Sequence, residues 1–167
     1  MFTAPTVLAR AWLRAVDWLE ALQPLAQLAA RLYIARVFFL SGLTKTRDWD
    51  TTLALFADEY HVPLLPPEVA AFAGTTGELV LPVLLALGLA GRFSAMGLFV
   101  LNIVAAISLT DIADAALQQH VFWGSLLAGL ILWGPGRWSL DRFVAPGFLG
   151  MTQTRPAVRV TAGGAGS

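Results

Sequence analysis

The sequence contains no cysteine, and charged side chains make up only 13% of its 167 residues. Without cysteine the chain has no disulfide, no thiolate nucleophile and no ligands for an iron–sulfur cluster or a cysteine zinc site. Its 11 basic and 11 acidic residues cancel, so no net positive charge attracts nucleic acid. Any chemistry must therefore use oxygen or nitrogen groups, or a bound cofactor.

Apolar residues are abundant instead. They account for 57% of the chain, against about 45–50% in soluble domains, and the mean hydropathy is +0.68. Four stretches reach the roughly 20 mostly apolar residues that cross a bilayer: about 24–44, about 69–91, Phe93 to Thr110 and about 116–134. They are too long and too uniformly apolar for strands or soluble helices. We predict an all-α protein, a bundle of four transmembrane helices in a lipid bilayer.

The N-terminal segment, 1–22, differs from these stretches. Charged residues are spaced among leucine and tryptophan there, which predicts an amphipathic helix in the headgroup layer. Residues 23–144 are then the membrane domain and 145–167 a disordered tail, whose last part is rich in Thr, Gly and Ala. Within the long connection 45–68, the stretch Trp49 to Tyr60 predicts a short helix that either caps the bundle or lies on the headgroups.

Loop arginines and lysines predict the orientation. With both termini in the cytoplasm, the inside holds seven basic residues and the outside two, which is the bias found in short loops. The inner set is Arg10, Arg14, Arg92, Arg137, Arg142, Arg155 and Arg159, and the outer set is Lys45 and Arg47. We therefore expect a multi-pass protein with both termini cytoplasmic.

Glu78 and Arg36 lie inside predicted spans. A charged side chain at mid-bilayer costs roughly 2.5–3.5 kcal/mol on insertion scales, so it is expected to face the bundle interior and to have a partner. At about 1.5 Å per residue, Arg36 lies about 12 Å and Glu78 about 14 Å below the outer ends of neighbouring antiparallel helices. An ion pair between them is the simplest prediction, with Asn102 in the same layer. Whether this polar plane works chemically or only joins helices stays open.

Other polar residues lie elsewhere on the spans. Arg31, Ser41 and Lys45 share a face of the first span that Arg36 does not. Lys45 and His120 lie at outer helix ends, where polar residues are ordinary. The chain has two histidines, and a metal or haem site made by His61 and His120 is a weaker interpretation than simple hydrogen bonding. No metal site is predicted.

Three groups of residues carry a family resemblance. They are Arg31 with Phe39-Leu40-Ser41-Gly42-Leu43-Thr44-Lys45, Glu78 with Leu84-Leu85-Ala86-Leu87-Gly88 and Arg92, and His120 with Gly134-Pro135-Gly136-Arg137-Trp138-Ser139-Leu140-Asp141. In this order they resemble the DoxX family of small bacterial four-helix membrane proteins. The resemblance implies an inner-membrane subunit or accessory of an oxidoreductase system, with quinone as acceptor in some members. It favours Arg31 as the important cation, whereas the depth count pairs Glu78 with Arg36, so the partner of Glu78 stays open.

The leading hypothesis is an oxidoreductase component whose polar plane binds a quinone and which receives electrons from a redox partner protein. Glu78 would carry the proton, and Arg36 or Arg31 would stabilise negative charge on the quinone oxygen. The headgroup would be held by Ser41, Lys45, Asn102 and His120. Two alternatives stay open: a non-catalytic assembly partner in a stress- or metal-response system, and a small-solute transporter, against which the missing inverted repeat argues. Activity of the chain alone and a homo-oligomeric state also stay open.

Overall fold

The computed structural model describes residues 7–109, 111–134 and 136–141, and over these ranges the fold is all-α, as predicted. Five helices follow one another: α1 (Val7–Arg47), α2 (Trp49–Asp58), α3 (Pro67–Leu87), α4 (Gly91–Ser108) and α5 (Asp114–Trp133). An isolated β-bridge joins Tyr60 to Leu109. The predicted disordered tail, 145–167, lies outside the described residues.

Four of these helices, α1, α3, α4 and α5, are long and apolar enough to cross a membrane. The prediction of four spanning helices is therefore confirmed, and the chain is a multi-pass membrane protein. Large apolar side chains on their outer faces remain exposed, among them Val100, Ile107, Val121 and Leu132. Exposed apolar side chains of this kind suit contact with acyl chains rather than water.

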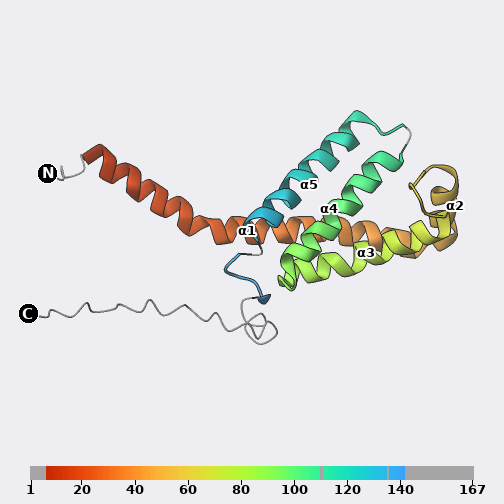
Figure 1. The fold of residues 1–167 in the computed structure, drawn as a ribbon, viewed down its shortest axis with the longest axis horizontal. Helices are drawn as coiled ribbons and strands as arrows, with labels where there is room; N and C mark the ends of the chain where they lie inside the picture. Colours follow the sequence, from red (N-terminus) through yellow and green to blue (C-terminus); the bar gives the residue numbers. More distant parts are fainter. Residues whose placement is uncertain (1–6, 110, 135, 142–167) are drawn as a thin grey trace, which may run out of the picture.

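Helix α1 is longer than one span requires. At about 1.5 Å per residue its 41 residues extend about 60 Å, roughly twice the thickness of a hydrocarbon core. Its N-terminal half projects away from the other helices, which pack along its C-terminal half (Figure 1). The interfacial helix predicted for 1–22 is therefore not distinguished as a separate element, because the described part from Val7 onward continues through Pro24 into the first span.

The core of the bundle lies between the C-terminal half of α1 and helices α3 to α5. α1 packs against α3, α3 against α4, and α4 against α5. The buried apolar residues of this core are Ile34, Phe38, Leu85, Ala95, Leu98, Leu127 and Leu130. α1 and α3 approach closely at Gly42, where an added Cβ would lie 3.0 Å from the Leu79 side chain and 3.1 Å from Glu78 Cβ. Small residues permit such contacts between membrane helices.

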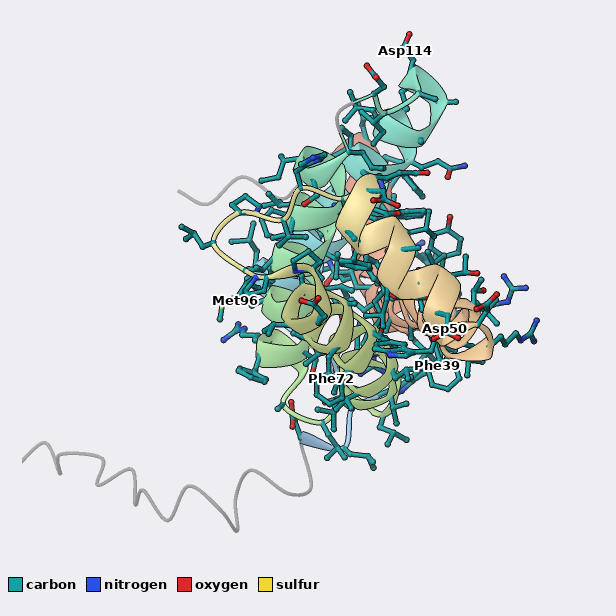
Figure 2. All side chains as sticks on the ribbon, turned by 90° about the vertical axis from the view of Figure 1, so that its right-hand side faces the viewer. Phe39, Asp50, Phe72, Met96 and Asp114 are labelled. Carbon is teal, nitrogen blue, oxygen red and sulfur yellow. The ribbon has the colours of Figure 1, made fainter. Side chains whose placement is uncertain are left out.

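Helix α2 covers one end of the bundle, here called the α2 end, and Figure 2 looks onto this end with α2 in front. The helix begins after Asp48, whose carboxylate accepts hydrogen bonds from the Thr51 hydroxyl and backbone N–H. These bonds, the hydroxyl's first, hold the pKa of Asp48 below its usual range. Phe56 packs with Ala70 and Ala71 of α3. The short helix predicted between Trp49 and Tyr60 is thus confirmed.

The opposite end, here called the turn end, holds the connection from α3 to α4. Gly88 ends α3 with a φ of 69°, in the left-handed region that favours glycine. The first turn of α4 is capped from a distant part of the chain, because Asp141 accepts hydrogen bonds from the backbone N–H groups of Ala90 (2.7 Å) and Gly91 (2.8 Å). A carboxylate suits this position, since it also complements the positive end of the helix dipole.

Candidate functional site

Lys45, in the last turn of α1, forms the centre of a polar cluster at the α2 end. Its ammonium group donates hydrogen bonds to Ser41 Oγ (2.9 Å) and to both carboxylate oxygens of Glu78 (2.9 and 2.7 Å). The three ammonium hydrogens thus have three acceptors. The side chains of Lys45 and Glu78 are only 20% and 13% exposed, so the pair is shielded more than an ordinary surface ion pair.

The predicted ion pair between Glu78 and Arg36 is wrong. Arg36 is exposed and forms no hydrogen bond or ion pair with any described residue. The depth count assumed that the outer ends of α1 and α3 are level, but the first turns of α3 pack against Phe56 of α2. Glu78 is therefore level with the last turns of α1, beside Gly42. There Lys45 is the cation that reaches it.

The predicted division of α1 into two faces is confirmed. Arg31 is buried, Ser41 and Lys45 are half-buried, and Arg36 is exposed. Only Ser41 and Lys45 of the inward face meet Glu78, however, because Arg31 lies several turns away at the turn end. The resemblance-based alternative, in which Arg31 is the partner of Glu78, is therefore not formed either.

Two residues that the sequence analysis missed lie near the Lys45–Glu78 pair. Tyr60 stacks on Phe56 with ring centroids 4.9 Å apart, and burial, with the charges of Glu78 and Glu59, raises the pKa of Tyr60. Thr75 is 4% exposed, and its hydroxyl has no hydrogen-bond partner among the described residues. Thr75 could have been found from the sequence, because residues three apart on a helix are neighbours and Thr75 is three residues before Glu78. Tyr60 could not have been found in this way, because the loop after α2 places it near Glu78.

Arg31 occupies the turn end and is 1% exposed. Its Nη2 donates to the backbone oxygen of Trp138 at 2.6 Å, while Nε and Nη1 are buried and have no hydrogen-bond partner among the described residues. Gly88 leaves the space for Nη1, since a Cβ there would collide with it. The carboxylate whose charge stabilises Arg31 is Asp141, the residue that caps α4. Arg31 therefore joins α1 to the segment after α5 at the turn end, and it lies far from Glu78.

Asn102 and His120 connect α4 to α5. Asn102 Nδ2 donates to the backbone oxygen of His120 at 2.9 Å, and Asn102 Oδ1 lies 2.9 Å from His120 Nδ1. A backbone oxygen only accepts, which fixes the orientation of the amide and places its oxygen against Nδ1. Nδ1 therefore carries the hydrogen, and Nε2 of the neutral ring is an acceptor. Asn102 was predicted in one layer with Glu78, and its neighbour Leu101 does lie against Gly77, the neighbour of Glu78. The hydrogen bonds of Asn102, however, go to α5.

A groove of about 440 Å³ lies beside this pair, between α4 and α5. Most of its lining is apolar, from residues such as Phe99, Ile103, Ile107, Leu117 and Val121, and its polar members are Asn102, His120 and Ser125. The exposed side chains of Ile107 and Val121 show that it opens on the lipid-facing surface. Its size and its few polar groups are typical of small-molecule sites between the helices of bundles.

A second cavity and the other histidine, His61, lie apart from these clusters. A cavity of about 870 Å³ at the turn end is lined by Asp17, Glu20 and Arg137, and by none of the predicted site residues. His61 Nδ1 is 3.2 Å from the backbone oxygen of Glu59, so the two histidines have different neighbours. Within the described ranges, no three histidine, aspartate or glutamate side chains gather as metal ligands would.

Comparison with known proteins identifies the family of the chain. Residues 26–111 match the DoxX family. The chain belongs to the DoxX family. It is similar to an uncharacterized protein of Haemophilus influenzae, with 31% identity over 126 residues that cover 70% of this chain and 82% of the relative. No solved structure matches the chain.

The segment that matches the DoxX family contains some of the polar residues described above and leaves out others. It includes Arg31, the complete Ser41–Lys45–Glu78 cluster and Asn102, and it ends before His120. The ion pair at the α2 end is therefore part of the DoxX segment, whereas the groove is formed jointly by that segment and by α5. The family resemblance that the motifs indicated is confirmed.

Proposed function

We propose that this DoxX family protein is an integral membrane component of a bacterial oxidoreductase system and binds a quinol in the groove between α4 and α5. The observation that carries the proposal is the acceptor on His120. His120 lines the groove; its Nδ1 is hydrogen-bonded to Asn102, and its Nε2 has no hydrogen bond to a described residue, so Nε2 is the atom that His120 offers to a ligand there. A quinol hydroxyl is a donor attached to an apolar ring, and its lipid tail suits a groove that opens to acyl chains.

The surroundings of His120 support such a ligand. Its ring stands edge-on to Trp123 with centroids 5.2 Å apart, which together with Asn102 restricts its orientation. In an apolar groove a single hydrogen bond is stronger than in water. The neutral histidine has no hydrogen to give a quinone carbonyl through Nε2. The groove is therefore expected to prefer the quinol over the quinone.

The electrons of the quinol need an acceptor outside this chain. The sequence has no cysteine, so an iron–sulfur cluster held by cysteines is excluded. We therefore assign electron transfer to a redox partner protein. Oxidation of the quinol releases two electrons to that partner, and two protons. His120 would hold one hydroxyl and, as a base, receive its proton, and the proton of the second hydroxyl would pass to water.

Lys45 and Glu78 have a different part in this proposal. Neither residue lines the α4–α5 groove, and the ammonium hydrogens are fully used by Ser41 and Glu78. A carboxylate engaged in this way favours a role in fixing α1 against α3, rather than the proton-carrying role expected from the sequence.

Quinol binding is tested with the purified full-length protein in lipid nanodiscs. A short-chain benzoquinol and the matching benzoquinone are titrated, and binding is followed by the change in tryptophan fluorescence. Trp123→Phe shows how much of that change comes from the tryptophan beside His120. His120→Phe should weaken quinol binding about 10-fold, which corresponds to about 1.4 kcal/mol for one lost hydrogen bond. Equal quinol affinity of wild type and His120→Phe would remove the proposal.

A matched pair of bulky substitutions locates the site. Ser125→Phe places a ring in the groove and should abolish binding. Val83→Phe adds a similar volume to an exposed position on α3 and should leave binding unchanged. If the two variants behave alike, the quinol binds somewhere other than between α4 and α5.

The alternative function, a membrane assembly partner, is favoured by a separate observation. Arg36 lies on an outer face of α1 without a partner among the described residues. An arginine on that face gives an assembly partner a charged group to contact, and this supports the assembly role.

A further inference from the structure

The cavity at the turn end lies where three spanning helices end. α3 ends at Leu87, α4 begins at Gly91 and α5 ends at Trp133. The segment after α5 lies against the turn between α3 and α4, because the backbone N–H of Asp141 donates to the backbone oxygen of Gly88 at 2.9 Å. Spanning helices end at the border between hydrocarbon and headgroups. The cavity, which Trp133 lines, therefore opens in the headgroup layer.

Two walls of this cavity carry opposite charges. One wall is the N-terminal half of α1, which continues beyond the bundle (Figure 1), and it supplies Asp17 and Glu20. The other wall is the segment after α5, which supplies Arg137 and the hydroxyl of Ser139. Arg137 forms no ion pair with either carboxylate across the cavity. A ligand between the walls therefore meets a cation on one side and anions on the other.

Asp141 also lines the cavity, but its carboxylate already has partners. It accepts hydrogen bonds from the first N–H groups of α4 at 2.7 and 2.8 Å. Within the described ranges, Asp17 and Glu20 have no third acidic or histidine side chain placed with them as a metal ligand. Two carboxylates suit a primary ammonium group, which has three N–H donors and no acceptor.

The cavity adjoins apolar surface. Its volume of about 870 Å³ lies within the range of small-molecule sites, about 300–1,000 Å³. Trp133 and Pro24 are among the lining residues, and their neighbours in the chain, Leu132 and Leu25, are exposed. A ligand with acyl chains can therefore keep its chains in the lipid while its polar head lies between the charged walls.

We propose that this cavity binds the headgroup of a phospholipid that carries a primary amine, of the phosphatidylethanolamine type. The ammonium group donates to Asp17 and Glu20. The phosphate accepts from Arg137 and Ser139, and the acyl chains lie beside Trp133. The proposal is independent of quinol binding, since the cavity is at the turn end and the quinol groove lies between α4 and α5.

The charges of the two walls select among headgroups. A choline headgroup has no N–H, so it cannot donate to the carboxylates of α1. A glycerol headgroup leaves the phosphate as the sole charge, and the two carboxylates repel it. A headgroup that carries both an ammonium and a phosphate is neutral and complements both walls. The ethanolamine headgroup therefore fits this cavity best.

The test uses native mass spectrometry of the full-length protein in mild detergent. Short-chain phospholipids with ethanolamine, choline or glycerol headgroups are titrated, and the dissociation constant of the first bound lipid is measured. The ethanolamine lipid should bind about 10-fold more tightly than the other two, as expected for a hydrogen bond to a charged group. Free phosphoethanolamine, which has the headgroup without the chains, should bind more weakly than the lipid.

Variants of the two walls identify the contacts. Asp17→Asn/Glu20→Gln should remove the preference for ethanolamine over choline. Arg137→Gln should weaken both lipids equally, because both carry the phosphate. The matched control is Asp50→Asn/Glu68→Gln, which changes two exposed acidic residues at the α2 end and should retain the preference.

Three outcomes would overturn the proposal. They are equal affinity of wild type for the ethanolamine and choline lipids, an unchanged preference in Asp17→Asn/Glu20→Gln, and equal affinity for free phosphoethanolamine and the lipid, which would assign the cavity to a soluble ligand. Asp17→Asn/Glu20→Gln should bind benzoquinol as wild type does. Loss of lipid preference with intact quinol binding, or the reverse, thus separates this site from the α4–α5 groove.

Discussion

Lys45 Nζ lies 2.7 Å from Glu78 Oε2, and this ion pair joins the last turn of α1 to α3 beneath α2. The pair lies next to Gly42, where α1 and α3 approach closely. Its position ties three elements together, because Thr52 of α2 donates to the backbone oxygen of Lys45 at 2.9 Å. Removing either charge should therefore lower the stability of the whole α2 end.

Lys45→Met should lower the free energy of unfolding by about 1–3 kcal/mol, because it leaves the largely buried Glu78 carboxylate without its donor. Glu78→Gln should cost less, since an amide oxygen still accepts from Lys45. The double variant Lys45→Met/Glu78→Met should recover part of the loss, because no unpaired charge remains. Unfolding in detergent measures all three.

Arg36→Met provides the control on the same helix for this series. It removes a charge that has no partner among the described residues, so the stability of the isolated protein should not fall. A loss as large as that of Lys45→Met would contradict the pairing seen here.

Gly88→Ala should destabilise the turn end. The φ of 69° disfavours a residue with a Cβ by about 1–3 kcal/mol, and the Cβ would also collide with Arg31 Nη1 and lie 2.6 Å from Ser139 Cβ. Gly74→Ala is the control, because its Cβ meets only Phe56 Cζ, at 3.8 Å, and alanine is the better helix former. Thermal unfolding should show a large loss for the first variant and none for the second.

Asp141→Ala should lower stability by about 1–2 kcal/mol, the usual effect of losing a helix N-terminal cap. The carboxylate binds the first N–H groups of α4 from a segment far away in the chain. Asp141→Asn keeps one acceptor oxygen and should lose less. Asp114→Ala, at an exposed helix start without a side-chain cap bond, should change stability little. An equal effect at both positions would contradict the capping role of Asp141.

The raised pKa of Tyr60 predicts that the folded protein loses stability at alkaline pH. Burial and the charges of Glu78 and Glu59 raise its pKa in the folded protein, whereas in the unfolded chain it titrates near about 10. The folded state then holds the proton more tightly, so the stabilisation is complete below about pH 10 and falls as the pH rises above that value. Unfolding temperatures measured from pH 8 to 11 should show this decline in wild type.

The chain contains two tyrosines, which supplies the comparison. Tyr60→Phe should reduce the alkaline decline, and Tyr33→Phe should preserve it. If both variants decline as wild type does, the environment of Tyr60 has no part in the effect.

Most of the fold could be predicted because its signals are local. Each predicted span has about the length needed to cross a bilayer, and the stretch Trp49 to Tyr60 indicates a short helix within the long connection. The continuity of α1 through Pro24 could not be read in this way. A change from mixed to apolar composition looks like a boundary between elements, although the backbone continues as one helix.

The candidate site was predicted only as a set of residues. The sequence indicated Glu78, Lys45, Asn102 and His120, because polar groups in apolar helices are costly and therefore informative. It did not indicate that Asn102 bonds to His120, since two helices had to be aligned before either could find the other.

The amino-acid sequence by itself determined that this chain is a helical membrane protein, because the free energy of placing an apolar segment in lipid is a sum over consecutive residues. Its motifs also indicated the DoxX family. Only the tertiary structure decided that Glu78 meets Lys45, that Arg36 faces outward and that Arg31 belongs to the other end. Those outcomes depend on how far α3 is displaced along α1. That displacement is set by the packing of Phe56 on α3 and by the contact at Gly42, between residues distant in the chain.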